Sequence, residues 1–143
     1  MNSPTYIKSI PETSRLVQTS EYVVRWSDMD AFGHINNAKY FTYFEQIRVD
    51  WLRSIGAGHS IVVANIGCTF LRAIVYPATI KVSFYLGEPG RKSVDSYYEI
   101  RDFDDLSTLY TLGHGTVVWF DHEAGESIEI PAPIRKLIAD QVR

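Results

Sequence analysis

The sequence predicts an α+β fold in which an antiparallel sheet of about five strands wraps around one long central helix. One strand pattern precedes the helical pattern, four strand patterns follow it, and only a short helical pattern, 134–141, ends the chain. One long helix cannot cover both faces of a parallel sheet, which needs helices on each side. The chain therefore reads as a single domain, 1–143, with residues 1–20 as a loosely ordered lead-in.

The long helix is predicted to begin at Asn36 or Asn37, because either side chain can cap its first turn. From Tyr40 to Ile55, apolar residues recur three and four positions apart, which gives the helix a broad apolar face. Gly56 favours an end to the helix just beyond that run.

Runs of β-branched and aromatic residues, separated by turn-forming residues, predict the strands. The predicted strands span residues 22–26, 60–72, 78–86, 93–101 and 106–121. The run 60–72 is mostly apolar, which predicts a strand buried on both faces or nearly so. Gly113 and Gly115 interrupt the last run, and they predict a bulge or a close approach of another backbone.

Composition narrows the class of protein. The net charge of −3 gives no reason to expect a nucleic-acid partner or an anionic membrane surface. No apolar run reaches the length of a membrane span, and the polar N-terminus lacks a signal core, so we expect a cytoplasmic protein. The single cysteine, Cys68, excludes an intrachain disulfide and reads as a buried, inert thiol. The histidines show no metal-ligand spacing, so no metal is expected.

The stretch from Arg25 to Tyr40, RWSDMDAFGHINNAKY, carries most of the chemistry. Free backbone N–H groups at the helix start, near Asn37, can polarise a carbonyl or hold an oxyanion. A carboxylate a few residues upstream can act as a nucleophile or as a base for water. From spacing alone, however, the favoured interpretation is that Asp28 and Asp30 cap the turn or the helix.

The pattern D-x-D-x-x-G-H-I-N-N-x-x-Y-x-x-Y-x-E-x-x-R, from Asp28 to Arg48, resembles the hot-dog-fold acyl-CoA thioesterases of the 4-hydroxybenzoyl-CoA thioesterase type. The resemblance continues more loosely to Arg135. It implies the hot-dog fold, which the order of elements also predicts. It further implies that Asp30 is the catalytic carboxylate and that the Asn37 N–H polarises the thioester carbonyl. Asp28 is then expected to have a structural role.

Other residues near the motif are weaker candidates. His34 is a candidate catalytic residue that orients water or donates to the thioester, and a structural turn histidine is an equally good interpretation. Glu45 is a rival catalytic acid, because a related hot-dog group uses a helix glutamate; pairing with Arg48 is the favoured interpretation of this residue. The candidate substrate-binding residues are Gly33, Asn36, Tyr40, Arg91, Lys92 and Ser93. The resemblance implies that the last three meet coenzyme A phosphates, and a solvated turn is an equally good interpretation of Arg91 and Lys92.

We therefore expect a metal-free hydrolase that cleaves acyl-CoA to a carboxylic acid and coenzyme A, with no cofactor beyond the coenzyme A of the substrate. An acyl carrier protein is the less favoured carrier, suggested by a similar H-x-N-N-x-K-Y run in acyl-carrier-protein thioesterases. One alternative is a hot-dog enoyl-CoA hydratase or dehydratase, although three residues rather than the usual four separate Asp30 from His34. The other is a non-catalytic acyl-binding module. Uncovered sheet edges predict a homodimer or homotetramer.

Overall fold

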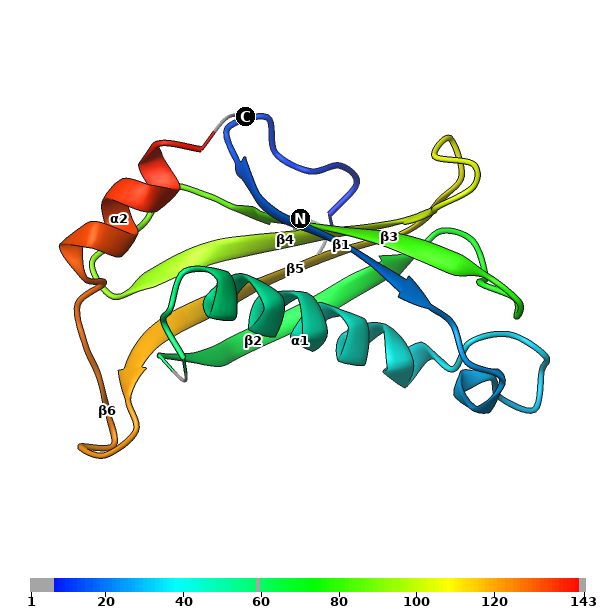
Figure 1. The fold of residues 1–143 in the computed structure, drawn as a ribbon, viewed down its shortest axis with the longest axis horizontal. Helices are drawn as coiled ribbons and strands as arrows, with labels where there is room; N and C mark the ends of the chain where they lie inside the picture. The colour runs from blue at the N-terminus through cyan, green and yellow to red at the C-terminus, as the bar shows by residue number, and fades with distance from the viewer. Residues whose placement is uncertain (1–6, 59, 142–143) are drawn as a thin grey trace, which may run out of the picture.

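The computed structural model describes residues 7–58 and 60–141. The elements are β1 (Arg15–Val23), the 3-10 helix η1 (Trp26–Asp28), α1 (Asn37–Ser54), β2 (Ile61–Phe70), β3 (Thr79–Leu86), β4 (Ser93–Asp102), β5 (Leu109–Asp121), β6 (Glu126–Ser127) and α2 (Ala132–Ala139). The five long strands lie in the order β1-β3-β4-β5-β2, and each is antiparallel to its neighbours. The curved sheet lies over α1, with α2 at one end (Figure 1). This arrangement confirms the predicted α+β hot-dog fold.

The start of α1 is defined by a side-chain cap. Asn36 is the N-cap, and its side chain accepts a hydrogen bond of 2.9 Å from the Ala38 N–H. Asn37 is therefore the first residue of the helix, which resolves the choice that the sequence left open. At the other end Gly56 has a φ of +70°, a left-handed conformation that costs glycine little and helps to end the helix.

Aromatic packing fixes α1 against the sheet. The Phe44 ring stacks on Tyr98 of β4 with 4.5 Å between ring centroids, and Trp51 contacts both Phe84 and Trp119 edge-on. A Cβ atom at Gly113 of β5 would lie 2.7 Å from Phe44 Cζ, which is closer than carbon atoms pack. The missing side chain at Gly113 therefore allows the helix to lie directly on the strand. The predicted close approach of another backbone is confirmed at Gly115, where a Cβ atom would clash with the backbone of Asn65 and Ile66 in β2.

Two expectations from the sequence are wrong. The run 60–72 was expected to be buried on both faces or nearly so, but among the described strands β2 pairs with β5 alone, and several of its side chains are exposed. The apolar residues of β2 therefore form an edge of the sheet that the isolated chain leaves uncovered. Residues 1–20 were expected to be a loosely ordered lead-in with at most a short extra strand near Arg15–Gln18, but that strand is the start of the nine-residue β1, which pairs with β3. Residues 1–6 lie outside the described residues.

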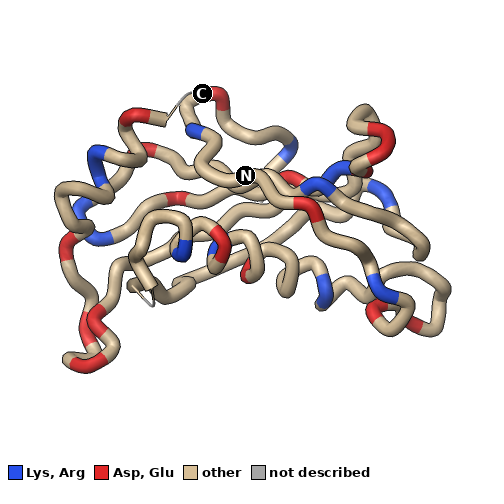
Figure 2. The backbone as a smooth tube through the Cα atoms, in the orientation of Figure 1, with Lys and Arg blue, Asp and Glu red and all other residues tan. Residues whose placement is uncertain are grey.

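The two ends of the sheet carry different connections. At one end lie the loop before α1, the β2–β3 connection and the β4–β5 connection; at the other, the β3–β4 turn lies next to α2 (Figure 1). The Arg135 guanidinium of α2 donates to the carbonyls of Gly90 and Arg91 and so fixes that turn. Acidic and basic residues are interspersed along the backbone, with no large region of one sign in this view (Figure 2).

Candidate active site

A short hairpin joins η1 to α1 and carries the candidate carboxylate. The Asp30 N–H donates to the His34 carbonyl at 2.9 Å, and the Asn36 N–H donates to the Asp28 carbonyl at 3.0 Å. Gly33 closes the turn with a φ of +85°, and its N–H bonds to the Asp30 carbonyl at 3.2 Å. A side chain at position 33 would be strained in this conformation, which gives the predicted role of Gly33 a backbone cause.

Asp28 is a buried structural acid. It accepts hydrogen bonds from the Arg25 N–H and guanidinium and from the Tyr43 hydroxyl, while Lys39 Nζ lies 3.8 Å away. Burial by itself would raise the pKa of Asp28, but the hydrogen bonds from Arg25 and Tyr43 outweigh it and lower the pKa from its ordinary value. The carboxylate therefore stays charged and connects the loop to α1.

Asp30 has one oxygen held by its own loop and one facing His34. Its Oδ1 accepts a 2.8 Å hydrogen bond from the Phe32 N–H, and its Oδ2 lies 3.8 Å from His34 Nδ1. The Asp30 side chain keeps 21% of its surface exposed, so it remains accessible. This arrangement leaves Oδ2 free to accept a proton or to orient the imidazole.

The backbone N–H of Asn37 is unused within the described chain. The Asn36 side chain takes the Ala38 N–H, and the Asn36 carbonyl takes the Lys39 N–H, but no acceptor among residues 7–58 and 60–141 is recorded for Asn37. The first N–H groups of a helix point out of its end and carry the positive pole of the helix dipole. An N–H of this kind can donate to a carbonyl oxygen on which negative charge develops.

A pocket of about 210 Å³ opens beside this helix start. It is lined by His34, Asn37, Tyr40, Phe70, Leu71, Arg72 and Ala73. Asp30 is not among the lining residues, but its charge acts on one of them. Burial raises the pKa of Tyr40, a hydrogen bond with the Ile74 backbone partly offsets this, and the Asp30 charge adds a smaller upward shift. The structure thus brings His34, Asn37 and Tyr40 to one pocket and places Asp30 in contact with that group through His34.

Residues 24–138 of the chain match the family model of the Thioesterase-like superfamily. The chain belongs to this family. It is 36% identical to PA2801 of Pseudomonas aeruginosa, a proposed thioesterase, with a TM-score of 0.81 over 87% of this chain and 99% of that one. It is 34% identical to a proposed acyl-CoA thioesterase from Xanthomonas campestris, with a TM-score of 0.70 over 76% of this chain and 96% of that one. It spans 54% of the Bacillus subtilis protein YsmA, at 29% identity over 80 residues.

The predicted membership of a hot-dog thioesterase family is therefore confirmed, and the pocket at the start of α1 is the candidate active site of this thioesterase-family protein. Sequence reasoning missed part of the pocket, namely Phe70, Leu71, Arg72 and Ala73 at the end of β2 and just after it. Arg72 is the one basic residue between Arg53 and Lys81, which is the only signal in the sequence that could have pointed to it. Its position beside the helix start depends on how β2 runs against α1.

The candidate coenzyme A contacts lie elsewhere in the same thioesterase-family chain. Arg91, Lys92 and Ser93 sit at the β3–β4 turn, whereas Asp30 lies near the start of β3, so the length of that strand, roughly 25 Å, separates them. Arg91 Nε is paired with Glu129 at 2.7 Å, and Lys92 Nζ lies 3.4 Å from Ser127 Oγ. Within one chain, the structure does not bring these residues to the pocket.

The favoured interpretation of Glu45, a pair with Arg48, is wrong. Arg48 instead donates a 3.1 Å hydrogen bond to the Tyr98 hydroxyl, and among the described residues no acid lies within ion-pair distance of it. Neither Glu45 nor Asp30 lines the candidate pocket, but Asp30 Oδ2 lies 3.8 Å from Nδ1 of His34, which does line it, whereas Glu45 lines a different pocket further along α1. Asp30 therefore stays the better candidate for the catalytic acid.

Three further observations concern the class of site and of protein. Among residues 7–58 and 60–141, no cluster of three or more His, Cys, Asp or Glu residues is arranged to hold a metal ion. Neither helix in the described part of the chain has the length and apolar character that crossing a membrane requires. Cys68 is half-buried, and burial raises its pKa to about 11, which agrees with the inert thiol predicted from the sequence.

Proposed function

We propose that this protein hydrolyses acyl-CoA thioesters to a free carboxylic acid and coenzyme A. The observation that carries the proposal is the Asn37 N–H at the start of an 18-residue helix, for which the described residues provide no acceptor; Asn37 lines a pocket together with His34, and Asp30 lies beside His34. Family membership supports thioester hydrolysis, and the structural relative named as an acyl-CoA thioesterase supports coenzyme A as the carrier. An acyl carrier protein stays the less favoured carrier.

In the proposed mechanism, the thioester carbonyl oxygen accepts the Asn37 N–H, which stabilises the negative charge as the carbonyl carbon is attacked. Asp30 either takes a proton from the attacking water or attacks the carbon itself and forms an anhydride that water then cleaves. In both routes the carbon–sulfur bond breaks, water supplies the new carboxylate oxygen, and the departing thiolate gains a proton. His34 lies between Asp30 and the pocket, where it can orient the water.

The coenzyme A moiety carries phosphates, which favour contact with basic side chains. Arg72 is the basic residue that lines the pocket in the same chain, and we propose it as a phosphate contact. Arg91, Lys92 and Ser93 remain candidates only if a second copy presents its β3–β4 turn to the pocket, because their own chain holds them at the far end of β3. Gly33 and Asn36 contribute by setting the hairpin and the helix cap.

Two variants test the contribution of the Asp30 carboxylate and that of the Asn37 backbone N–H separately. We expect Asp30→Asn to lower kcat/KM for acyl-CoA hydrolysis by about 10²-fold or more, measured as thiol release. Asn37→Pro removes the N–H while keeping a residue that suits the first helical position, and the preceding Asn36 already has the extended conformation that proline requires, with φ −59° and ψ 133°. We expect a loss of about 10²-fold or more for Asn37→Pro.

Asn37→Ala is the matched control, since it keeps the backbone N–H, and it should retain activity within a few-fold of the wild type. If Asp30→Asn hydrolysed acyl-CoA at the wild-type rate, the Asp30 carboxylate would not be catalytic. If Asn37→Pro did so, the Asn37 N–H would not stabilise the transition state. Hydration of enoyl-CoA without thiol release would favour the hydratase alternative. Ligand binding with neither reaction would indicate an acyl-binding module. The cytoplasmic location expected from the sequence stays a prediction.

We also propose a homodimer in which β2 pairs with β2 of a second copy; a homotetramer built from such dimers remains open. Both edges of the sheet are formed by long strands, but β1 contains Arg15 and Glu21, whereas the ten residues of β2 contain no charge. Edge strands that face water are protected by charged side chains, so an uncharged edge favours a paired one. Ala64→Lys in β2 should shift the dimer to monomer in analytical ultracentrifugation, while Thr19→Lys in β1 should not. A dimer unchanged by Ala64→Lys would contradict this pairing.

A further inference from the structure

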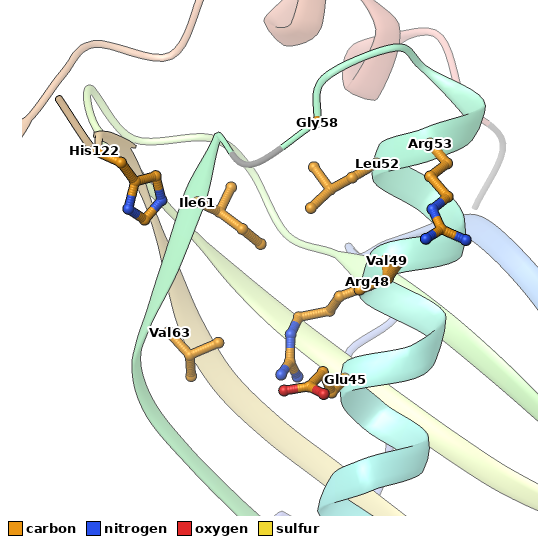
Figure 3. A pocket seen from close by; sticks show the side chains of 9 residues that line it. All are labelled: Glu45, Arg48, Val49, Leu52, Arg53, Gly58, Ile61, Val63 and His122. Carbon is orange, nitrogen blue, oxygen red and sulfur yellow. The ribbon is translucent and has the colours of Figure 1, made fainter.

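A second and larger pocket, of about 640 Å³, lies further along α1, between this helix and β2. Its apolar wall includes Val49 and Leu52 of α1 and Ile61 and Val63 of β2. Figure 3 shows that the Arg48 guanidinium points into this space from the helix, while Ile61 and Val63 face it from the strand. The pocket is therefore an apolar cavity with a cation in its wall.

Arg48 has an unusual environment for an arginine. Only 8% of its surface is exposed, and its recorded contacts are a 3.1 Å hydrogen bond to the Tyr98 hydroxyl and a stacking contact with the same ring at 5.8 Å. A guanidinium has five N–H donors, and a buried arginine is normally paired with an anion. No described acid lies within ion-pair distance, so an anion that enters the pocket would pair with a charge that is already desolvated.

The other charged groups of the pocket do not cancel this charge. Glu45 and Arg53 also line it, so two arginines stand against one glutamate, in a chain whose net charge is −3. Glu45 is exposed, whereas Arg48 is buried. The cavity therefore favours a ligand that ends in a single negative charge on an otherwise apolar body.

The two pockets are aligned along α1. Asn37 and Arg48 are eleven residues apart, which is about three helical turns, so they lie on the same side of the helix and roughly 16 Å apart. Between them, α1 and β2 present the half-buried apolar side chains of Phe41, Ile66 and Cys68. An extended chain whose thioester lies at the Asn37 N–H would thus run over apolar side chains and end near Arg48.

We propose that Arg48 is a specificity-determining residue that binds a carboxylate at the far end of the acyl group, so that the preferred substrates are thioesters of long dicarboxylic acids. A planar guanidinium binds a carboxylate through two parallel hydrogen bonds. Tyr98 acts as a positioning residue, because its hydroxyl holds Arg48 and in turn accepts a hydrogen bond from Ser96 at 3.2 Å. This inference rests on the proposed thioesterase activity.

The experiment compares dodecanedioyl-CoA with dodecanoyl-CoA, which differ only in the terminal carboxylate. For the wild type we expect kcat/KM to favour the dicarboxylic substrate at least tenfold, and we expect Arg48→Gln to reduce that ratio at least tenfold. Arg48→Lys, which keeps the charge but not the planar fork, should retain part of the preference. Arg101→Gln is the control, because Arg101 is paired with Glu99 at 2.8 Å and does not line the pocket.

Binding of half-esters separates this inference from the proposed function, because an ester stands in for the thioester end and leaves only the far carboxylate free. Calorimetry with wild-type protein should show that monomethyl dodecanedioate binds more tightly than methyl dodecanoate, which has no carboxylate, whether or not either thioester is hydrolysed. If Arg48→Gln does not fold, the guanidinium resonances of wild-type Arg48 in nitrogen-15 NMR should still shift with the half-ester and not with methyl dodecanoate. Equal affinity for the two esters, or an unchanged substrate ratio in folded Arg48→Gln, would overturn the proposal. Thiol release from neither substrate, together with selective binding of the half-ester, would reject only the hydrolase.

Discussion

The Tyr43 hydroxyl donates a hydrogen bond of 3.2 Å to the buried carboxylate of Asp28 and so joins the second turn of α1 to the loop that precedes it. Because the pKa of Asp28 is lowered in the folded protein, its charge stabilises the fold above the ordinary value of 3.8, and this stabilisation is lost as the pH falls through the lowered pKa.

Asp28→Asn should therefore lower the free energy of unfolding by about 2 kcal/mol at pH 7, since hydrogen bonds to a charged group are lost. The difference between variant and wild type should shrink as the pH is lowered below 3.8, as measured by urea denaturation at a series of pH values. Asp104→Asn, at an exposed acid, is the control and should have little effect at any pH. A deficit that stays constant down to pH 2 would contradict the assigned role of the charge.

The cap of α1 predicts a contrast between two adjacent asparagines. Asn36→Ala removes the acceptor of the Ala38 N–H and should destabilise the protein by about 1 kcal/mol, while Asn36→Asp should restore most of that loss. Asn37→Ala removes no recorded side-chain hydrogen bond and should be close to neutral. Thermal denaturation measures all three variants. Equal losses in Asn36→Ala and Asn37→Ala would show that the cap is not formed as described.

The contact between Gly113 and Phe44 predicts a steric penalty. Gly113→Ala places a Cβ atom 2.7 Å from Phe44 Cζ and 3.1 Å from Tyr98 Cδ1, and it should destabilise the protein by about 1–3 kcal/mol. Adding Phe44→Leu should make the double variant more stable than the sum of the two single effects, because the ring that clashes is gone. Gly87→Ala, whose Cβ would have ordinary contacts at 3.7 Å, is the control. Simple additivity would indicate that the core relaxes elsewhere.

The half-buried thiol of Cys68 predicts slow alkylation. With a pKa of about 11 against an ordinary value of 9.0, its thiolate fraction near pH 8 is about a hundredfold lower than that of a free thiol. Iodoacetamide should therefore label the folded protein at least tenfold more slowly than the urea-unfolded chain at the same pH. As Cys68 is the only cysteine, mass spectrometry follows this site without interference. Equal rates in both states would show that the thiol is not protected.

The fold could be predicted because local signals agreed with one another. The spacing of apolar residues from Tyr40 to Ile55, the asparagines before it and the glycine after it each indicate the same helix. What periodicity cannot supply is the order of strands in the sheet. An apolar run such as Ile61–Phe70 looks alike whether it lies in the centre of a sheet or at an edge that another surface covers, and the expectation that both of its faces are buried or nearly so was wrong for that reason.

In the candidate site, too, residues that are close in sequence could be predicted, and residues that only the fold brings together could not. Asp30, His34 and Asn37 are close in sequence, so a local motif was enough to place them together. Arg72 joins them only through the pairing of distant segments, and nothing local distinguishes it from a surface arginine. Arg91 and Lys92 show the converse difficulty, because two basic residues after a turn resemble a phosphate site whichever end of the sheet they occupy, and their role stays a prediction. The partner of Arg48 was also misjudged, since helical spacing favoured Glu45 and the core offered Tyr98 instead.

The missing side chain at Gly113 has a consequence for how this scaffold can diversify. Because Phe44 packs directly on the backbone of β5 at Gly113, no ligand can bind between α1 and this strand. A ligand along α1 has to bind beside the helix, over the uncharged edge strand β2. If a second copy pairs with β2, its residues would also line the pockets along α1. Substrate preference could then change through substitutions at the interface between the two copies, while the aromatic core between α1 and the sheet stays unchanged.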